Sequence, residues 1–522
     1  MFRRWLVPDL AAVAAGITLF YCLLAWDGTR RLFRDADSGW HITTGELIVS
    51  SRSLPRTDPY SYTRRAQQWF AWEWGAEVAM ALVHRMSGLA GVAWLYACAI
   101  AVGVWLWFRL HWVVQGNFWI ACLMAVPMLS TANLHWLARP HVLGWVLALA
   151  ALWKAEKGGE KFRWQDGAVI FLISALWANL HASFFLAPLI ALIYAAAHWL
   201  SPLLWQLEAS RERARARWFV CACAASALGT LANPYGWNLH RHIAGYLSNS
   251  ELLARIGEFQ SFNFHAPGAG QILAGVFLAA LGLFATLSER RLAHFLLLSL
   301  LLVSALRVAR GLPLLALMGL PLANGSITAA LEKGAGNETL TAGLRRRLVA
   351  FLEYSRRLRA IDAACRGWVW ALLAAVLALA WVCTPAVAAR AGFPPEEFPV
   401  AASRYLEKLP RGIRLLHPDK YGGYLIYRFH GQRPVFFDGR SDFYGADFLK
   451  QYGRLMRVQP GWREQLERFG ATHALLPRDA PLAEALASAG WKRLYSDEVA
   501  VLFERPPEAA SGKELVGVFG VK

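Results

Sequence analysis

The stretch LAAVAAGITLFYCLLAW, residues 10–26, is an unbroken apolar run, and DADSGWH, residues 35–41, follows it shortly afterwards. The first stretch is long enough to form most of a membrane-spanning helix. The second places two carboxylates, Asp35 and Asp37, close to the point where that helix would leave the bilayer. Carboxylates at such an edge serve as metal ligands, as general bases or as helix caps. The sequence therefore predicts a membrane protein with candidate chemistry in its first loop.

Composition extends this interpretation to the whole chain of 522 residues, of which 56% are hydrophobic and 17% charged. An average soluble domain carries about 25% charged residues. This deficit excludes a disordered chain, a coiled coil and a single soluble domain. Apolar runs of about 20 residues recur and predict a polytopic α-helical protein with about eleven transmembrane helices. The predicted spans are 5–26, 88–110, 117–133, 140–154, 165–180, 183–204, 217–233, 270–287, 292–306, 311–330 and 367–388.

The net charge of +18 is explained by topology and not by nucleic-acid binding. Basic clusters at 154–163, 211–217, 290–291 and 333–366 all fall on one side of these spans. Because cytoplasmic loops are enriched in Lys and Arg, the N-terminus is expected in the cytoplasm. An odd number of spans places the C-terminal region on the outer, periplasmic side of a bacterial inner membrane.

Four regions follow from this pattern. Residues 1–330 form a transmembrane domain with a large outer loop at 27–87, and 331–366 form a basic, amphipathic cytoplasmic segment against membrane lipids. Residues 367–388 are the last span, and 389–522 read as a periplasmic α/β domain. Helices are expected in the outer loop at 40–50 and 70–86, lying along the membrane surface. In the C-terminal domain, helices are expected at 399–409, 445–456, 461–470 and 480–489, and strands at 411–416, 423–429, 434–438, 472–477, 491–496 and 499–504.

The acidic pair in the outer loop leaves three interpretations open. Asp35 and Asp37 can bind a divalent metal, or one of them can act as a general base on an acceptor hydroxyl. His41 follows Asp37 at i+4, so the two side chains share one face of a helix that begins there. The third interpretation is a helix N-terminus, where Asp is favoured by capping and by the helix dipole.

The wider pattern resembles the GT-C superfamily of integral-membrane glycosyltransferases. It is most similar to the bacterial branch related to protein O-mannosyltransferases and lipid A aminoarabinose transferases. The resemblance covers the layout of residues 1–330 and includes an acidic motif after the first span. The motifs that carry it are DADSGWH at 35–41, PRTDPYS at 55–61, WEW at 72–74, RP at 139–140, WANLH at 177–181, NPYG at 233–236 and RVARGLP at 307–313.

The resemblance implies a sugar donor carried on a polyprenyl phosphate and a catalytic role for Asp37. This carboxylate would deprotonate the acceptor, which then displaces the polyprenyl phosphate with inversion at the anomeric carbon. Asp35 would assist, either by binding a divalent metal such as Mg²⁺ or Mn²⁺ together with Asp37, or by orienting the acceptor. The acceptor is a glycan, lipid or protein. The paired Asp-Glu of protein mannosyltransferases is missing, which does not favour a protein.

Arginine residues on the outer side are the candidates for the donor phosphate. Arg307 and Arg310 lie between two spans on the side where basic residues are scarce, and Arg139 is a similar case. Arginine offers a planar, bidentate donor to phosphate oxygens. The alternative is that these side chains reach the membrane interface as solvated cations.

Further polar residues are candidates for substrate or acceptor contacts. Asp438 and Arg440 follow a predicted strand, where polar groups often face a ligand. The structural alternative is a tight Asp-Gly turn with a local ion pair. The remaining candidates are His41, Glu73, His181 and Glu258.

The sequence thus predicts a glycosyltransferase that acts on the outer face of the membrane. Two alternatives come from other classes of protein. A multi-pass transporter or flippase of an envelope glycolipid would carry ionisable residues at mid-membrane depth, whereas the charges here gather at span ends. A non-catalytic assembly factor would use the outer domain to bind a partner.

Overall fold

The computed structural model describes residues 3–25 and 27–506, and the chain divides into two compact units. Unit 1 combines residues 1–32 with 72–392, and unit 2 combines residues 33–71 with 393–522. The large outer loop is therefore split. Its first part folds with the C-terminal region, and its second part folds with the membrane helices.

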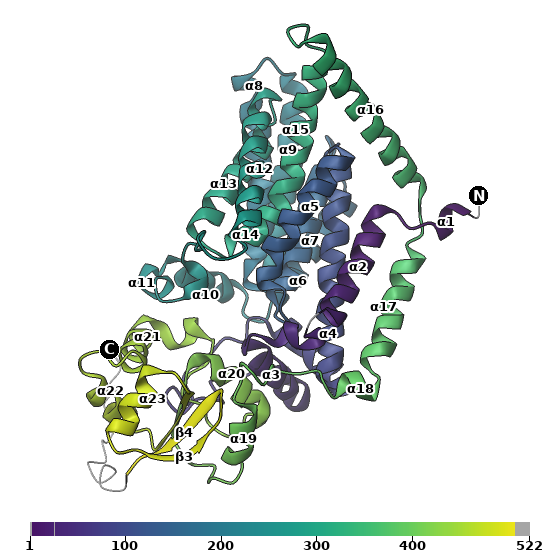
Figure 1. The fold of residues 1–522 in the computed structure, drawn as a ribbon. Helices are drawn as coiled ribbons and strands as arrows, with labels where there is room; N and C mark the ends of the chain where they lie inside the picture. The colour runs from purple at the N-terminus through teal and green to yellow at the C-terminus, as the bar shows by residue number, and fades with distance from the viewer. Residues whose placement is uncertain (1–2, 26, 507–522) are drawn as a thin grey trace. The chain divides into compact units, whose positions relative to one another are not determined.

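Unit 1 is a bundle of helices, as Figure 1 shows. Polar side chains mark where helices begin: Asp9 accepts the Ala12 N–H at 2.8 Å, and Asn117 accepts the Trp119 N–H at 2.9 Å. The longer helices are α2 (Leu10–Leu24), α4 (Trp74–Val113), α5 (Phe118–Ala132), α6 (His141–Glu156), α7 (Trp164–Leu180), α8 (Leu186–Leu204), α9 (Ala209–Thr230), α10 (Trp237–Ser248), α12 (Ala269–Ser288), α13 (Leu292–Arg307), α15 (Leu320–Ala335), α16 (Ala342–Ala364) and α17 (Val369–Val382). The short ones are α1 (Arg3–Leu6), η2 (Asn133–His135), η3 (Ala182–Phe185), α11 (Ser250–Leu253), η4 (Gly257–Phe259), α14 (Gly311–Leu314), the π-helical turn η5 (Leu315–Gly319) and α18 (Pro385–Ala388), while η1 (Gly28–Phe33) lies at the junction of the two units.

Each predicted span coincides with a helix in this bundle, and the chain is a multi-pass membrane protein. Among the described residues, five helical segments are long and apolar enough to cross a bilayer by length and composition. A sixth is added if α16 and α17, which are bent by 67° relative to one another, form one broken span. The shorter apolar helices α2 and α13 are expected to be further spans. The count of eleven stays a prediction.

The predicted helix at 70–86 is part of a longer element. Helix α4 begins at Trp74 and continues to Val113, with a break at Ser87 and Gly88. Gly88 has a φ of +59°, a conformation that glycine adopts at little cost. The segment before the break and the apolar span after it are therefore separate helical pieces in direct succession.

Unit 2 holds a four-stranded sheet surrounded by helices. The strand order is β1-β2-β4-β3, with β1 parallel to β2 and the other pairs antiparallel. The central strands β2 and β4 are almost wholly buried, as their Val, Leu and Ala content predicts. The strands are β1 (Leu415–Leu416), β2 (His473–Pro477), β3 (Lys492–Ser496) and β4 (Ala500–Glu504). The helices are α3 (Asp37–Ser51), α19 (Val400–Leu406), α20 (Asp419–Arg428), α21 (Ser441–Met456), α22 (Trp462–Phe469) and α23 (Pro481–Ser488).

Most predicted elements of this unit are confirmed to within a few residues, but the first half of the predicted sheet is wrong. The segment 423–429 is not a strand, because it belongs to helix α20. The segment 434–438 pairs only through an isolated bridge between Val435 and Ser61. Strand 411–416 is reduced to Leu415–Leu416.

Two glycines explain why 423–429 is helical. A Cβ on Gly423 would lie 2.3 Å from the backbone oxygen of Ala36, and a Cβ on Gly39 would lie 2.3 Å from the backbone oxygen of Gly423. Helices α3 and α20 therefore meet backbone to backbone, a contact that only glycine permits. This close packing overrides the strand preference of the aromatic and aliphatic residues that follow Gly423.

We expect Gly423→Ala to destabilise unit 2 by about 2 kcal/mol, because a methyl group inserted at a closed contact forces the two helices apart. Gly412→Ala is the matched control, since a Cβ on Gly412 meets no atom within 4 Å. Limited proteolysis of the purified chain, with cleavage followed at residues 393–506, measures the difference. Equal protease resistance of the two variants would contradict this account of the helix contact.

Candidate active site

Asp35 and Asp37 lie at the start of helix α3 in unit 2. Asp37 is the first residue of the helix and is 8% exposed. The Asp35 side chain accepts the backbone N–H of Asp37 at 2.8 Å, which is the geometry of an Asx turn just before the helix. Asp37 is thus positioned at the positive end of the helix dipole.

The C-terminal region packs against Asp37. A Cβ on Gly439 would lie 1.9 Å from Asp37 Oδ1, so the carboxylate lies directly against the Gly439 backbone. His41, one helical turn beyond Asp37, is 1% exposed and its ring centroid lies 3.6 Å from that of Trp40. Asp37 and His41, predicted to share a helix face, are both in the interior of unit 2.

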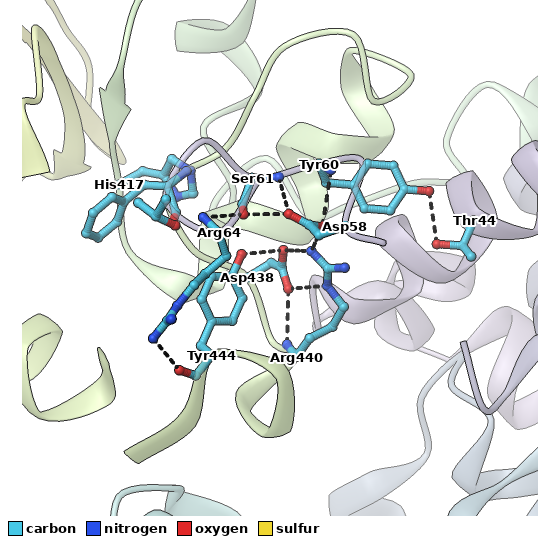
Figure 2. Close-up of polar contacts among 11 residues, drawn as sticks. Thr44, Asp58, Tyr60, Ser61, Arg64, His417, Asp438, Arg440 and Tyr444 are labelled. Carbon is cyan, nitrogen blue, oxygen red and sulfur yellow. Dashed lines mark hydrogen bonds and ion pairs between the residues drawn. The ribbon is translucent and has the colours of Figure 1, made fainter. Parts of the chain in front are cut away.

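Arg440 is the centre of a buried network next to Gly439, which Figure 2 shows. Its Nη2 donates to Asp58 Oδ1 at 2.8 Å and to Asp438 Oδ2 at 2.7 Å, and its Nε donates to Asp438 Oδ1 at 2.8 Å. The Tyr444 hydroxyl donates to Asp438 at 3.0 Å, and the Ser61 hydroxyl donates to Asp58 at 2.6 Å. Asp58, which belongs to the PRTDPYS motif, therefore forms a salt bridge with the C-terminal domain.

Aromatic rings enclose the same guanidinium. Its Cζ lies 4.6 Å from the centroid of the Trp69 ring and 5.0 Å from that of Phe443. Such cation–π contacts favour a desolvated guanidinium. Burial lowers the pKa of Arg440, but Asp438 and Asp58 outweigh it and raise the pKa above its ordinary value.

This geometry bears on the predicted contact residues Asp438 and Arg440. Asp438 has no exposed surface and Arg440 is 3% exposed, so their polar groups are turned toward each other and toward Asp58. The observed local ion pair is the one that the structural alternative predicts. A substrate contact by either residue stays a prediction that would require this network to open.

A second group of charged residues lies in unit 1, around Glu258. Arg310 forms an ion pair with Glu258 Oε2, and Arg139 Nη1 lies 3.4 Å from Glu258 Oε1. The Arg310 N–H also donates to the Glu258 backbone oxygen at 3.2 Å. Burial raises the pKa of Glu258, but Arg310 and Arg139 outweigh this effect and hold the pKa far below its ordinary value. We call Arg139, Glu258 and Arg310 the Glu258 cluster.

The arginines of the Glu258 cluster act electrostatically on His181, which in turn lies next to Glu73. The His181 Nε2 atom lies 3.6 Å from Glu73 Oε1, and its Nδ1 is 2.7 Å from the Ser183 hydroxyl. Burial lowers the pKa of His181 to about 3, and the charges of Arg310 and Arg139 act in the same direction. His181 is therefore neutral at physiological pH and suited to hydrogen bonding.

Two further residues near this cluster were not selected from the sequence. Glu77 and Tyr96 on helix α4 have no exposed surface, and Tyr96 lies within electrostatic reach of Glu73, Glu77 and Arg139. A glutamate in a largely apolar helical segment is the signal that identifies Glu77. Tyr96 offers no such signal, because a tyrosine within an apolar run is common.

Arg307 differs from Arg310 in its surroundings. It is the last residue of α13 and its side chain is exposed, whereas Arg310 pairs with Glu258. Of the three predicted phosphate-binding arginines, the structure brings Arg139 and Arg310 together and leaves Arg307 outside. The binding role of each stays a prediction.

Few side chains are placed to act as metal ligands. Within residues 3–25 and 27–506, no group of three or more His, Cys, Asp or Glu side chains is placed to hold a metal ion. One oxygen of Asp35 is already engaged with the Asp37 N–H. The residues of the acidic motif do not by themselves make a metal site.

Comparison with solved structures identifies the fold. The oligosaccharyltransferase AglB of Archaeoglobus fulgidus, in complex with an inhibitory peptide and a dolichol-phosphate, is similar over 90% of this chain and 69% of its own, with a TM-score of 0.54 and 11% identity. The same protein tethered to an acceptor peptide has a TM-score of 0.54 at 12% identity, over 90% and 68% of the two chains. ArnT of Cupriavidus metallidurans bound to undecaprenyl phosphate matches over 97% and 99% of the two chains, with a TM-score of 0.47 and 14% identity.

Sequence comparisons add no relative. No protein-family model matches the chain, and no curated protein matches it. The likeness to AglB spans both units and includes the helical bundle that the apolar runs predict. The chain therefore has the fold of the oligosaccharyltransferase AglB.

Proposed function

We propose that this protein is a glycosyltransferase that transfers a sugar from a polyprenyl-phosphate donor to a glycan, lipid or protein acceptor. The observation that carries the proposal is the placement of Asp37, a nearly buried carboxylate at the start of α3, held against Gly439 in a chain with the GT-C fold. AglB, which shares this fold, is an oligosaccharyltransferase crystallised with a dolichol-phosphate. That description supports a donor of the same chemical class here.

The proposed reaction is a single displacement at the anomeric carbon. Asp37 accepts the proton of the acceptor hydroxyl as that oxygen forms its bond to the sugar. The bond between the anomeric carbon and the phosphate oxygen breaks, and the polyprenyl phosphate leaves with the electron pair. Attack from the face opposite the leaving group inverts the anomeric configuration. Asp35 contributes by fixing the first turn of α3, and thereby the direction of the Asp37 carboxylate.

The Glu258 cluster is the proposed site of the donor phosphate. Arginine binds phosphate through two parallel hydrogen bonds, and Arg139 and Arg310 converge on a single carboxylate. The position of the Glu258 carboxylate against both guanidinium groups supports a site for an anionic group here. Glu73, His181 and His41 remain proposed contacts to the sugar or the acceptor.

The proposed location is the inner membrane of a bacterium, with the N-terminus in the cytoplasm and unit 2 in the periplasm. The distribution of basic residues over the loops supports this orientation. Polyprenyl-linked sugars and outer-face acceptors would meet there, and a soluble nucleotide-sugar donor would not be needed. A divalent metal requirement stays a prediction.

We expect Asp37→Asn to reduce sugar transfer by about 10³-fold, because it removes the general base and changes the shape of the side chain little. Asp447→Asn, on the exposed surface of the same unit, is the control and should keep full activity. Mass spectrometry of lipid-linked sugars and envelope glycans, from cells that carry only the variant, measures transfer. A fully active Asp37→Asn protein that is present at normal levels would refute the assignment.

We expect Arg310→Ala to weaken binding of undecaprenyl phosphate to the purified chain by about tenfold to a hundredfold, since it removes charged hydrogen bonds. Arg307→Ala is the matched control and should change binding by less than about threefold, because an exposed cation contributes little. Glu258→Gln should tighten binding or leave it unchanged, because it removes the competing carboxylate. Equal losses in Arg310→Ala and Arg307→Ala would contradict a phosphate site in the Glu258 cluster.

A further inference from the structure

A cavity of about 280 Å³ lies in unit 1, at the end of the bundle opposite to the Glu258 cluster. Helix α6 connects the two places, because Arg139 lies just before its first turn and Glu156 is its last residue. A helix of 16 residues is about 24 Å long. The cavity, named here the Glu156 cavity, is therefore separate from the proposed donor site.

Five chain segments line the Glu156 cavity. They are the turn after α4, the end of α6, the second half of α8, the first turns of α9, and the turn that joins α12 to α13. Its charged and ionisable lining residues are Glu156, His198, Glu212, Arg215, Arg290, Arg291 and His294, with Tyr194 as a further polar residue.

Both carboxylates of this lining already have local partners. Glu156 lies 2.9 Å from His294 Nε2 and accepts a hydrogen bond from the Tyr194 hydroxyl. Glu212 lies 2.7 Å from His198 Nδ1. Each carboxylate of the cavity therefore has a histidine as a hydrogen-bond partner.

The three arginines of the lining are not neutralised by an ion pair among the described residues. In the described part of the chain, none of Arg215, Arg290 and Arg291 forms an ion pair with a carboxylate. Arg215 and Arg291 are half-buried, so their charge is only partly screened by water. With both histidines neutral, the lining carries a formal charge of +1, and protonated histidines would raise it to +3.

The turn that carries Arg290 and Arg291 adds a second observation. Arg290 has a φ of +56°, and the Arg291 N–H donates to the Thr286 oxygen at 2.8 Å, which ends helix α12 in a left-handed cap. Glycine is the usual residue at such a cap. The cap thus places two arginines in succession in the turn that lines the cavity.

We propose that the Glu156 cavity binds a phosphate group, either the headgroup of an anionic lipid or a free phosphate ion. Guanidinium groups of Arg215 and Arg291 would hold the phosphate oxygens, and Arg290 would supply further charge at the rim. Phe219 and Leu292 are apolar residues of the same lining and would suit the glycerol or acyl part of a lipid. This site is independent of sugar transfer and lies far from Asp37 along the chain.

The test uses the full-length chain in a neutral detergent, with native mass spectrometry of bound ligand. One arm titrates inorganic phosphate, and the other titrates phosphatidylglycerol against phosphatidylcholine. All measurements use an Arg310→Ala background, so that the Glu258 cluster does not contribute an anion-binding signal. Thermal unfolding of each variant shows that it is folded.

We expect Arg291→Ala and Arg215→Ala each to lower phosphate or phosphatidylglycerol binding by at least about tenfold. Arg213→Ala is the matched control, because Arg213 is exposed on the same helix as Arg215 and does not line the cavity. A loss in the phosphate arm identifies a free phosphate site, and a loss confined to the lipid arm identifies a headgroup site.

The proposal is overturned if neither ligand binds better than phosphatidylcholine, or if Arg291→Ala and Arg213→Ala bind equally well. These outcomes do not depend on catalysis. An Asp37→Asn chain that is inactive but binds phosphate normally would leave the Glu156 cavity intact, and an active chain without phosphate binding would overturn only the cavity.

Discussion

The buried guanidinium of Arg440 is the interaction on which unit 2 depends. It joins Asp438, two residues away, to Asp58, which lies 382 residues earlier in the chain. All three side chains are almost completely buried. Removing one partner of a buried ion pair typically costs about 3–5 kcal/mol, because an unpaired charge remains in a medium that solvates it poorly. Residues 33–71 of the first loop and the C-terminal domain are thereby made into one folded body.

This constraint also determines where the candidate base lies. Gly439 is situated between Asp438 and Arg440, and its backbone is in contact with the Asp37 carboxylate. A shift of Arg440 would therefore move the surface against which Asp37 rests. The contact between Gly39 and Gly423 fixes the same helix from another side. Two glycines and one arginine of the C-terminal domain thus hold an acidic motif that belongs to the first outer loop.

The sequence predicts local features well in this protein and distant partners poorly. Long apolar runs require helices in a bilayer, because every backbone polar group must be satisfied within its own segment, so each predicted span contains a helix. The ion pair between Asp438 and Arg440 follows from residues two apart. Asp58 as the third member does not, since no local pattern connects it to residue 440. The strand predicted at 423–429 is wrong for the same reason. The helix there depends on a glycine contact with a segment far away in the sequence.

At the two ends of unit 1, the number of arginines and the ion pairs that they form have different explanations. The proposed orientation accounts for the excess of basic residues at the loops that contain Arg215 and Arg291. It does not account for Glu258, which pairs Arg139 with Arg310 at the other end. An acidic partner lowers the cost of placing two cations at a membrane edge and keeps them oriented toward one point. At the end that holds the Glu156 cavity, His198 and His294 are hydrogen-bond partners of the carboxylates, and the arginines of the lining form no ion pair within the described residues. The same residue types therefore produce a cluster of two arginines on one carboxylate at one end of the bundle, and a cavity whose arginines lack a carboxylate partner among the described residues at the other.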